Sequence, residues 1–244
     1  MTIGILSAMS KEHEQLVHLL ANAVTESDGR YTFTIGSLGQ NTLVLMQCGI
    51  GKVNAAVGAT TLIRHFKPQC IISTGCAGGI DNRLKVMDVV VSTATAYHDV
   101  TIPGCEPGQI QGMPARFKAE EQLVETAMEY LPQPFADNRQ PAVYAGLICT
   151  GDQFISDKQQ LSAIKQQFPD ALAVDMESAA VAQTCFLHGL PYVSFRVLSD
   201  TPGADGHWQQ YQDFWSQLAE RSFSITRRFL AALPTEFALL DFKD

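Results

Sequence analysis

Two acidic side chains stand where a predicted strand runs into a predicted helix, a position from which they could act on a polar substrate. Residues 171–174 are apolar enough for a short buried strand, and the apolar residues take helical spacing over 176–186. Asp175 and Glu177 therefore lie at the junction. Ligands of open α/β sheets bind at the carboxyl ends of strands, and a helix N-terminus stabilises nearby negative charge. An acidic first helical turn is also common without any function, so this stretch alone leaves the function open.

Further chemical groups follow two other predicted strands. Residues 2–7 form one of them, and Ser10 is expected to cap the next helix, which places Glu12 in its first turn. Most acids at such a position are simply solvated, so Glu12 has no assigned role when taken alone. The predicted strand over 192–198 contains Arg196 and is followed directly by Ser199 and Asp200.

Small residues and one aromatic side chain mark two further candidate contact points. Residues 75–79 read as a glycine-rich turn after a strand, where a ligand could come close. Cys76 lies within it, and a small buried residue is a simpler interpretation than a nucleophile because no histidine is placed to activate it. Phe154 follows the predicted strand over 143–150, where an aromatic ring either fills the core or stacks on a planar base.

Two motifs invite functions that the sequence does not support. Residues 49–52 read Gly-Ile-Gly-Lys, yet the spacing of a phosphate-binding loop is absent and Val53 stands where a magnesium-binding hydroxyl belongs. His98 and Asp99 could begin a metal site, but no second cluster of histidine or cysteine completes it. We expect neither nucleoside triphosphate binding nor a bound metal or cofactor.

Composition excludes several classes of protein. The chain has 244 residues, 46% of them hydrophobic, which is ample for one large α/β domain. Its 25 acidic and 17 basic residues give a net charge of −8, which opposes binding to nucleic acid or anionic lipid. The six cysteines form no C-x-x-C pair, as expected of reduced thiols. No signal sequence or membrane span is recognisable, so a cytoplasmic location is expected.

Predicted strands and helices alternate along the chain. This order indicates β-α-β units with a largely parallel central sheet flanked by helices, in one domain. Residues 97–116 are rich in proline and glycine and cannot be regular structure; a loop of this length in a compact domain is usually functional. A long amphipathic helix is predicted over 208–229, and the apolar tail after Pro234 is expected to dock on the protein.

Seven separate segments, taken together, resemble the 5′-methylthioadenosine/S-adenosylhomocysteine nucleosidases of the nucleoside phosphorylase superfamily. The segments are 4–9 with Glu12, 49–53, 73–79, 97–99, 151–155, 174–177 and 196–200. The resemblance covers roughly residues 1–230. It implies a three-layer α/β/α sandwich with a mixed, partly barrel-like central sheet. It also implies one nucleosidase domain over 1–233, followed by a C-terminal tail over 234–244.

The resemblance also implies roles for individual residues. Asp200 would protonate adenine N7 with help from Ser199, and Glu12 would activate the attacking water. Glu177 would hold the ribose hydroxyls. The other implied substrate contacts are Met176 on the sugar, Phe154 and Ile155 on adenine, and Arg196, Cys76, Ala77, Gly78, Met9, Ile50 and Tyr211 around them. Such a set suits cleavage of an N-glycosidic bond, whose oxocarbenium-like transition state needs an acid at the departing base and carboxylates near the sugar.

Two positions depart from the family's pattern, and other functions stay open. Cys76 stands where serine is common, and Asp175 where glutamate is frequent. The resemblance commits Arg196 to the carboxylate and water around Glu12. The small-molecule substrate would be a 5′-substituted adenosine such as methylthioadenosine, S-adenosylhomocysteine or 5′-deoxyadenosine. A phosphorylase would replace the water by phosphate, and a non-catalytic nucleoside-binding protein would not need both Glu12 and Asp200.

The resemblance finally implies a homodimer. The segment over 97–116 resembles the loop that reaches into the neighbouring subunit's pocket in this family. We expect Ile102 or Pro103 to close the end of the partner's site that holds the 5′ substituent.

Overall fold

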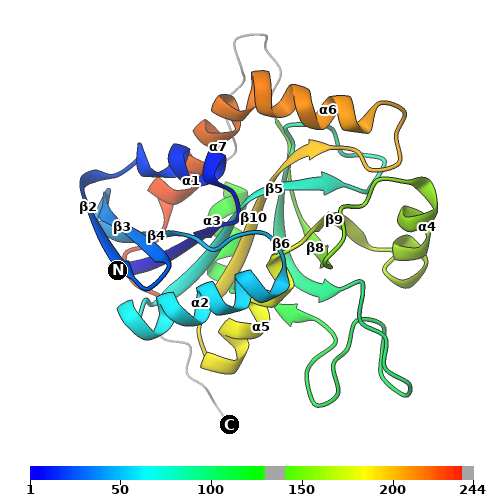
Figure 1. Ribbon diagram of the computed structural model, residues 1–244, viewed down its shortest axis with the longest axis horizontal. Helices are drawn as coiled ribbons and strands as arrows, with labels where there is room; N and C mark the ends of the chain where they lie inside the picture. The colour runs from blue at the N-terminus through cyan, green and yellow to red at the C-terminus, as the bar shows by residue number, and fades with distance from the viewer. Residues whose placement is uncertain (130–140, 238–244) are drawn as a thin grey trace.

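One continuous β-sheet of mixed strand direction forms the centre of the molecule (Figure 1). The computed structural model describes residues 1–129 and 141–237, and ten strands lie within those ranges. They are β1 (Thr2–Ser7), β2 (Ala21–Asp28), β3 (Tyr31–Leu38), β4 (Asn41–Gln47), β5 (Cys70–Gly79), β6 (Val89–Tyr97), β7 (Phe117–Lys118), β8 (Val143–Thr150), β9 (Ala171–Asp175) and β10 (Tyr192–Asp200). Their order across the sheet is β10, β6, β8, β9, β5, β1, β4, β3, β2, with β7 beside β6.

Part of this sheet closes into a barrel because β5 is long enough to pair with three neighbouring strands. Its first four residues pair with β1, its last two pair with β9, and β10 runs parallel to it over nearly its whole length. The ring β10, β6, β8, β9, β5 is therefore closed, and the remaining strands extend from it as an open sheet. Strands buried on both faces read as continuous apolar runs, as in β6, which begins with three buried valines.

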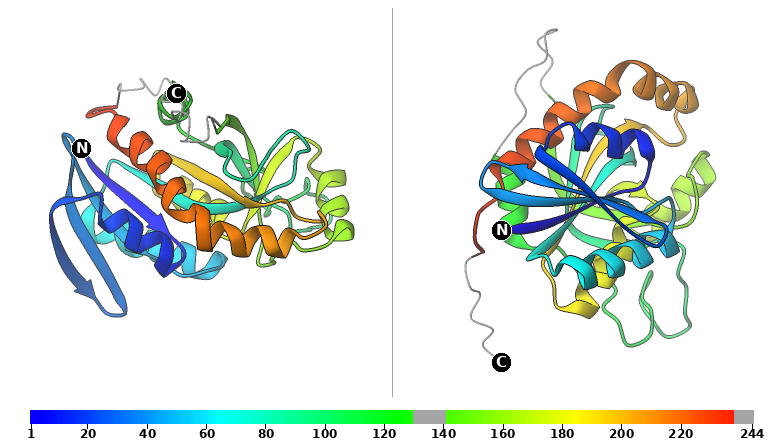
Figure 2. Two further views of the ribbon diagram at one scale, coloured as in Figure 1. Left: turned by 90° about the horizontal axis from the view of Figure 1, so that it is seen from above. Right: turned by 60° about the vertical axis from the view of Figure 1, so that its left-hand side comes forward.

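Helices cover both faces of the sheet. They are α1 (Ser10–Val17), α2 (Lys52–Phe66), α3 (Glu121–Glu129), α4 (Lys158–Gln167), α5 (Ser178–His188), α6 (His207–Asp213) and α7 (Ala219–Ala232), with a π-helical turn over Phe214–Leu218 between the last two. On one face α2 packs on α5 through Ala55, Ala59 and Ala179. On the other face α1, α3 and α7 share a core with Leu16, Leu123 and Phe229 (Figure 2). These layers confirm the expected sandwich with a mixed, partly barrel-like sheet.

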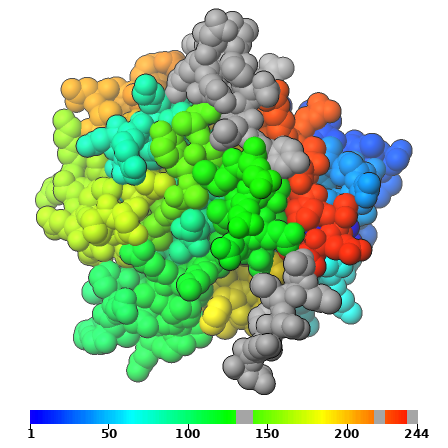
Figure 3. All heavy atoms as spheres, turned by 180° about the vertical axis from the view of Figure 1, so that it is seen from behind, coloured from blue at the N-terminus to red at the C-terminus, as the bar shows by residue number. Residues whose placement is uncertain are grey.

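The space-filling view from behind shows α3 and the end of α7 side by side on one surface (Figure 3). Residues 98–116 contain no helix or strand, as the sequence predicts, and they protrude from the body beside α2 and α5 (Figure 1). Phe237 packs against the core, while the tail predictions for residues 238–244 lie outside the described ranges. None of the described helices is long and apolar enough to cross a membrane.

Three local predictions are wrong for physical reasons, and one strand was missed. The sheet is not largely parallel, because β10 pairs antiparallel with β6 and β9 antiparallel with β5. Residues 75–79 are not a turn, since pairing with β10 carries β5 through to Gly79. The N-cap of α1 is Met9 rather than Ser10, because the Glu12 carboxylate accepts the backbone N–H of Met9. The edge strand β2 was not expected at all.

Candidate active site

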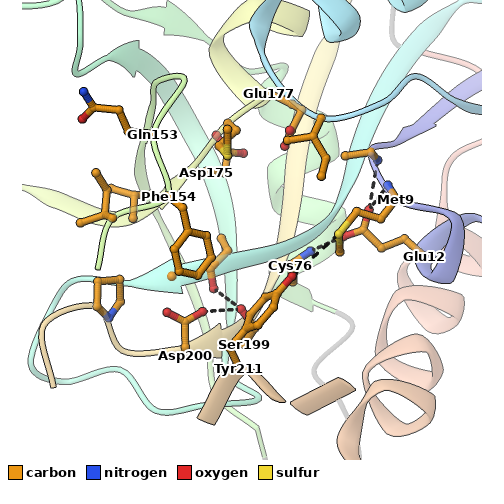
Figure 4. Close-up of a pocket in the computed structure, with 18 residues that line it drawn as sticks. Met9, Glu12, Cys76, Gln153, Phe154, Asp175, Glu177, Ser199, Asp200 and Tyr211 are labelled. Atoms are coloured by element: carbon orange, nitrogen blue, oxygen red, sulfur yellow. Dashed lines mark hydrogen bonds between the residues drawn. The ribbon is translucent and has the colours of Figure 1, made fainter. Parts of the chain in front are cut away.

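A pocket opens where the ends of β5, β9 and β10 meet the first turns of α1 and α5. Its volume, with the open mouth included, is about 630 Å³, a size typical of small-molecule sites. All but one of the predicted site residues line it: Met9, Glu12, Ile50, Cys76, Ala77, Gly78, Phe154, Ile155, Met176, Glu177, Ser199, Asp200 and Tyr211. Figure 4 shows Asp200 and Phe154 on one side of this pocket and Glu12 with Met9 on the other.

Arg196 is the predicted site residue that does not line the pocket. It lies beneath the floor, 1% exposed, where its Nε donates to Asp175 Oδ2 at 2.8 Å and its Nη2 donates to Ser73 Oγ at 2.9 Å. Its closest carboxylate partner is Asp175, and the charges of Glu177 and Glu12 also act on it, so the expected commitment of Arg196 to the carboxylate and water around Glu12 stays a prediction. A side chain at Gly75 would collide with both Arg196 Nη1 and Glu12 Oε1, so this glycine allows the two charged groups to approach.

Glu12 is held rigidly by the turn between β1 and α1. Its Oε2 accepts the N–H groups of Ala8 and Met9 at 3.0 Å, and its Oε1 accepts the N–H of Cys76 at 3.0 Å. The side chain is 3% exposed, so these three donors replace the water that a carboxylate needs. A carboxylate fixed in this way can accept a proton from a molecule in the pocket without moving.

Asp200 ends β10 on the opposite side of the pocket (Figure 4). Ser199 Oγ donates to its Oδ1 at 2.6 Å and also lies 3.3 Å from the carbonyl oxygen of Ala77. Burial raises the pKa of Asp200, and the Ser199 hydrogen bond and His207 oppose this effect without cancelling it. Asp200 therefore holds a proton more readily than an exposed aspartate, as a general acid must.

Glu177 lies at the N-cap of α5 between these two acids. The backbone N–H of Gly51 donates to its Oε1 at 2.9 Å. Burial raises the pKa of Glu177 to about 7, against the opposing charge of Arg196, whose Nη2 is 3.9 Å from Oε2. The carboxyl group of Glu177 therefore holds a proton more readily than an exposed glutamate does.

Aromatic side chains from α6 cover the mouth of the pocket. The ring of Phe154 lies 5.5 Å from that of Tyr211 and 5.9 Å from that of Trp208, both at steep angles. The Tyr211 hydroxyl is 3.9 Å from the sulfur of Met9, so Tyr211 spans the opening between the two sides. Phe154 is 44% exposed and lines the pocket, so it is not a core plug, and a planar ligand could stack on it.

Cys76 is not equipped for nucleophilic chemistry. Burial, followed by the nearby charge of Glu12, raises the pKa of its thiol well above the ordinary value. The thiol stays neutral at physiological pH. Its backbone N–H, not its sulfur, makes the functional contact with Glu12.

The structure adds residues that the sequence did not single out for the site. Ala8, Gln153, Val174 and Pro202 line the pocket. Asp175, which the sequence did single out, lines it too and also anchors Arg196. His207 lies beside Phe154, with ring centres 6.4 Å apart, and nothing in the sequence distinguished it from the other histidines. Among the described residues, no group of three or more histidine, cysteine, aspartate or glutamate side chains is arranged to hold a metal ion.

Comparisons with known proteins agree on one family. Residues 2–231 match the sequence model of the phosphorylase superfamily. The 5′-methylthioadenosine/S-adenosylhomocysteine nucleosidase of Actinobacillus succinogenes is 40% identical over 235 residues, which cover 96% of this chain and 100% of that protein. The enzyme of the same name from Lysinibacillus sphaericus is 39% identical over the same shares of the two chains.

Solved structures of similar proteins contain ligands. The nucleosidase of Colwellia psychrerythraea in complex with adenine superimposes with a TM-score of 0.88 at 36% identity, and 96% of each chain is covered. The S-adenosylhomocysteine nucleosidase of Streptococcus pyogenes in complex with 5-methylthiotubericidin gives a TM-score of 0.87 at 35% identity, covering 96% of this chain and 98% of that one.

Proposed function

Because this chain belongs to the phosphorylase superfamily and, within it, to the 5′-methylthioadenosine/S-adenosylhomocysteine nucleosidases, we propose a mechanism built from its own residues. In this proposal the enzyme hydrolyses the N-glycosidic bond of methylthioadenosine and S-adenosylhomocysteine, which releases adenine and a 5-substituted ribose. We extend the proposal to 5′-deoxyadenosine, which has the same adenine and ribose groups.

In this mechanism Asp200 gives its proton to N7 of adenine while the bond between C1′ and N9 lengthens. The bonding electrons leave with the base, and positive charge develops on the sugar. Glu12 takes a proton from a water molecule as the water oxygen attacks C1′. Glu177 binds the ribose hydroxyls, and Phe154 stacks on the base.

The observation that carries the proposal is the placement of Glu12 and Asp200 on opposite sides of one pocket, each suited to its task. Glu12 is fixed by three N–H donors as a proton acceptor, and burial favours the protonated form of Asp200. Ser199 supports both states of Asp200. It can donate to the carboxylate, or turn its proton toward Ala77 and accept from the carboxylic acid.

We expect cleavage that does not depend on phosphate. A phosphate dianion must be met by basic side chains or N–H groups when it leaves water. The described pocket lining contains no lysine or arginine, Arg196 is committed beneath the floor, and Glu12 would repel an anion. The measurement is adenine release from methylthioadenosine with and without phosphate, with the sugar product identified. Formation of 5-methylthioribose 1-phosphate, or a rate that requires phosphate, would show that the enzyme is a phosphorylase.

We also propose that two copies of the chain form a homodimer. Val53 of α2 and Leu187 of α5 are exposed, and they line one hollow together with Val100 and Ile110 of the protruding residues 98–116. A second copy covering them would remove apolar area from water and bring Ile102 or Pro103 to the partner's pocket. Sedimentation at micromolar concentration is expected to give a dimer. A fully active monomer under these conditions would contradict the proposal.

A further inference from the structure

Three short motifs that supply no acid or base to the proposed reaction meet beside the pocket, where Ile50 and Gln153 line it. They are the Gly-Ile-Gly-Lys segment before α2 (49–52), the pair His98 and Asp99 after β6, and the pair over 151–152 after β8. Because β6 and β8 are parallel neighbours, with Tyr97 opposite Thr150, their carboxyl ends bring the last two motifs together.

Lys52 connects the three motifs. Its Nζ lies 2.6 Å from Asp99 Oδ2, and its backbone N–H donates to Asp152 Oδ1 at 2.8 Å. The N–H of Asp152 in turn donates to Asp99 Oδ2 at 2.9 Å. We refer to Lys52, Asp99 and Asp152 as the clamp. It ties the start of α2 to the ends of two strands.

The central contact of the clamp is a shielded ion pair. The side chains of Lys52 and Asp99 are 24% and 16% exposed. Burial alone would raise the pKa of Asp99, but the hydrogen bonds from Lys52 and from the N–H of Asp152 outweigh it and lower the pKa. Asp99 is therefore ionised, and its charge-assisted bond to Lys52 is of the stronger kind.

The clamp acts on the neighbouring Gly51, whose N–H meets Glu177. Gly49 and Gly51 have φ angles of 96° and 94°, a region that glycine adopts without strain. A turn with two such glycines has little stiffness of its own, yet it carries both the Gly51 donor and Ile50, which lines the pocket. Contacts from outside the turn must hold it in place.

We propose that Lys52, Asp99 and Asp152 are positioning residues that hold the Gly51 N–H against Glu177 and so set the grip of this carboxylate on the ribose. The inference rests on the proposed role of Glu177 in the nucleosidase reaction. Loosening the clamp weakens binding of the sugar, while the contacts of the base with Phe154 and Asp200 stay unchanged.

The clamp also affects the pH at which nucleoside binds. The Gly51 N–H lowers the pKa of Glu177 and opposes the effect of burial. The other charged or titratable groups that face Glu177 are Arg196 on β10, Asp175 on β9, Glu12 on α1 and Cys48 after β4. When the Gly51 donor is lost, the pKa of Glu177 rises further, so the carboxylate is lost on acidification at a higher pH.

The test compares binding of a nucleoside with binding of adenine, which has no ribose. Calorimetry on the full chain measures the Kd of 5-methylthiotubericidin and of adenine in Lys52→Met, Lys52→Arg and Asp152→Ala. In Lys52→Met and Asp152→Ala we expect the Kd of the nucleoside to rise about tenfold and that of adenine to stay within about twofold. The pH below which nucleoside affinity falls is expected to move upward, and Lys52→Arg is expected to restore wild-type binding.

The matched control is Asp170→Asn. It breaks the ion pair between Asp170 and Arg116, which is also 2.6 Å long and lies away from the pocket. It should change neither Kd. Asp152 is about half exposed, so Asp152→Ala tests the clamp even if Lys52→Met does not fold. Wild-type nucleoside affinity in a folded clamp variant would overturn the inference, and so would equal weakening of nucleoside and adenine. Because binding is measured, the result stands apart from the adenine-release assay that tests the proposed function.

Discussion

Replacement of Asp200 by asparagine is expected to lower kcat by about a hundredfold or more while nucleoside still binds. The amide keeps the shape of the side chain and can still accept the Ser199 hydrogen bond. It cannot deliver a proton to N7, so the base must leave as an anion. Steady-state release of adenine from methylthioadenosine measures kcat, and calorimetry measures the Kd.

Asp205→Asn is the control for this prediction, because Asp205 lies on the same loop after β10 and its side chain is fully exposed. It removes one negative charge near the pocket without touching the lining. Its kcat should equal that of the wild type. A near-wild-type kcat for Asp200→Asn would remove Asp200 from the role of general acid.

Glu12→Gln is expected to lower kcat by a factor on the order of 10² to 10⁴, the range for loss of a general base. A glutamine presents one acceptor oxygen where the glutamate presents two. The N–H groups of Ala8 and Met9 at one oxygen, or that of Cys76 at the other, therefore lose their partner. A buried N–H without an acceptor costs about 1–3 kcal/mol, so the Tm should fall as well.

Glu14→Gln separates the two effects, since Glu14 lies two residues along α1 and is exposed. It should preserve both kcat and Tm. If Glu12→Gln lowers only the Tm, and the folded enzyme keeps its kcat below that temperature, then Glu12 is a structural carboxylate and another group activates the water.

The candidate site could be located from sequence because its groups follow strands. Glu12 follows β1, Glu177 follows β9 and Asp200 ends β10, and the ends of these strands converge in the fold. The roles of these residues came from the family resemblance and stay predictions. The partners of Arg196 could not be predicted, because Ser73 lies 123 positions away and only the barrel brings the two together.

The fold was predicted in outline, with errors at places that tertiary structure decides. The edge strand β2 has every residue exposed, so its sequence shows no alternation of buried and exposed positions. The direction of β10 relative to β6 depends on how the barrel closes, which no local pattern encodes. The division into one domain and a tail, the cytoplasmic location and the lack of a cofactor also stay predictions.

The π-helical turn between α6 and α7 sets the direction in which Tyr211, which covers the pocket, points relative to the core residues of α7. A π turn contains one residue more than an α-helical turn, and each residue of a helix rotates the direction of its side chain by about 100°. Ile225 and Phe229 of α7 point into the core, whereas Tyr211 of α6 points over the pocket. Loss of a single residue within Phe214–Leu218 would turn Tyr211 away while Ile225 and Phe229 stay in place. The cover of this pocket can therefore change through the length of the adjoining helical turn, with every pocket residue unaltered.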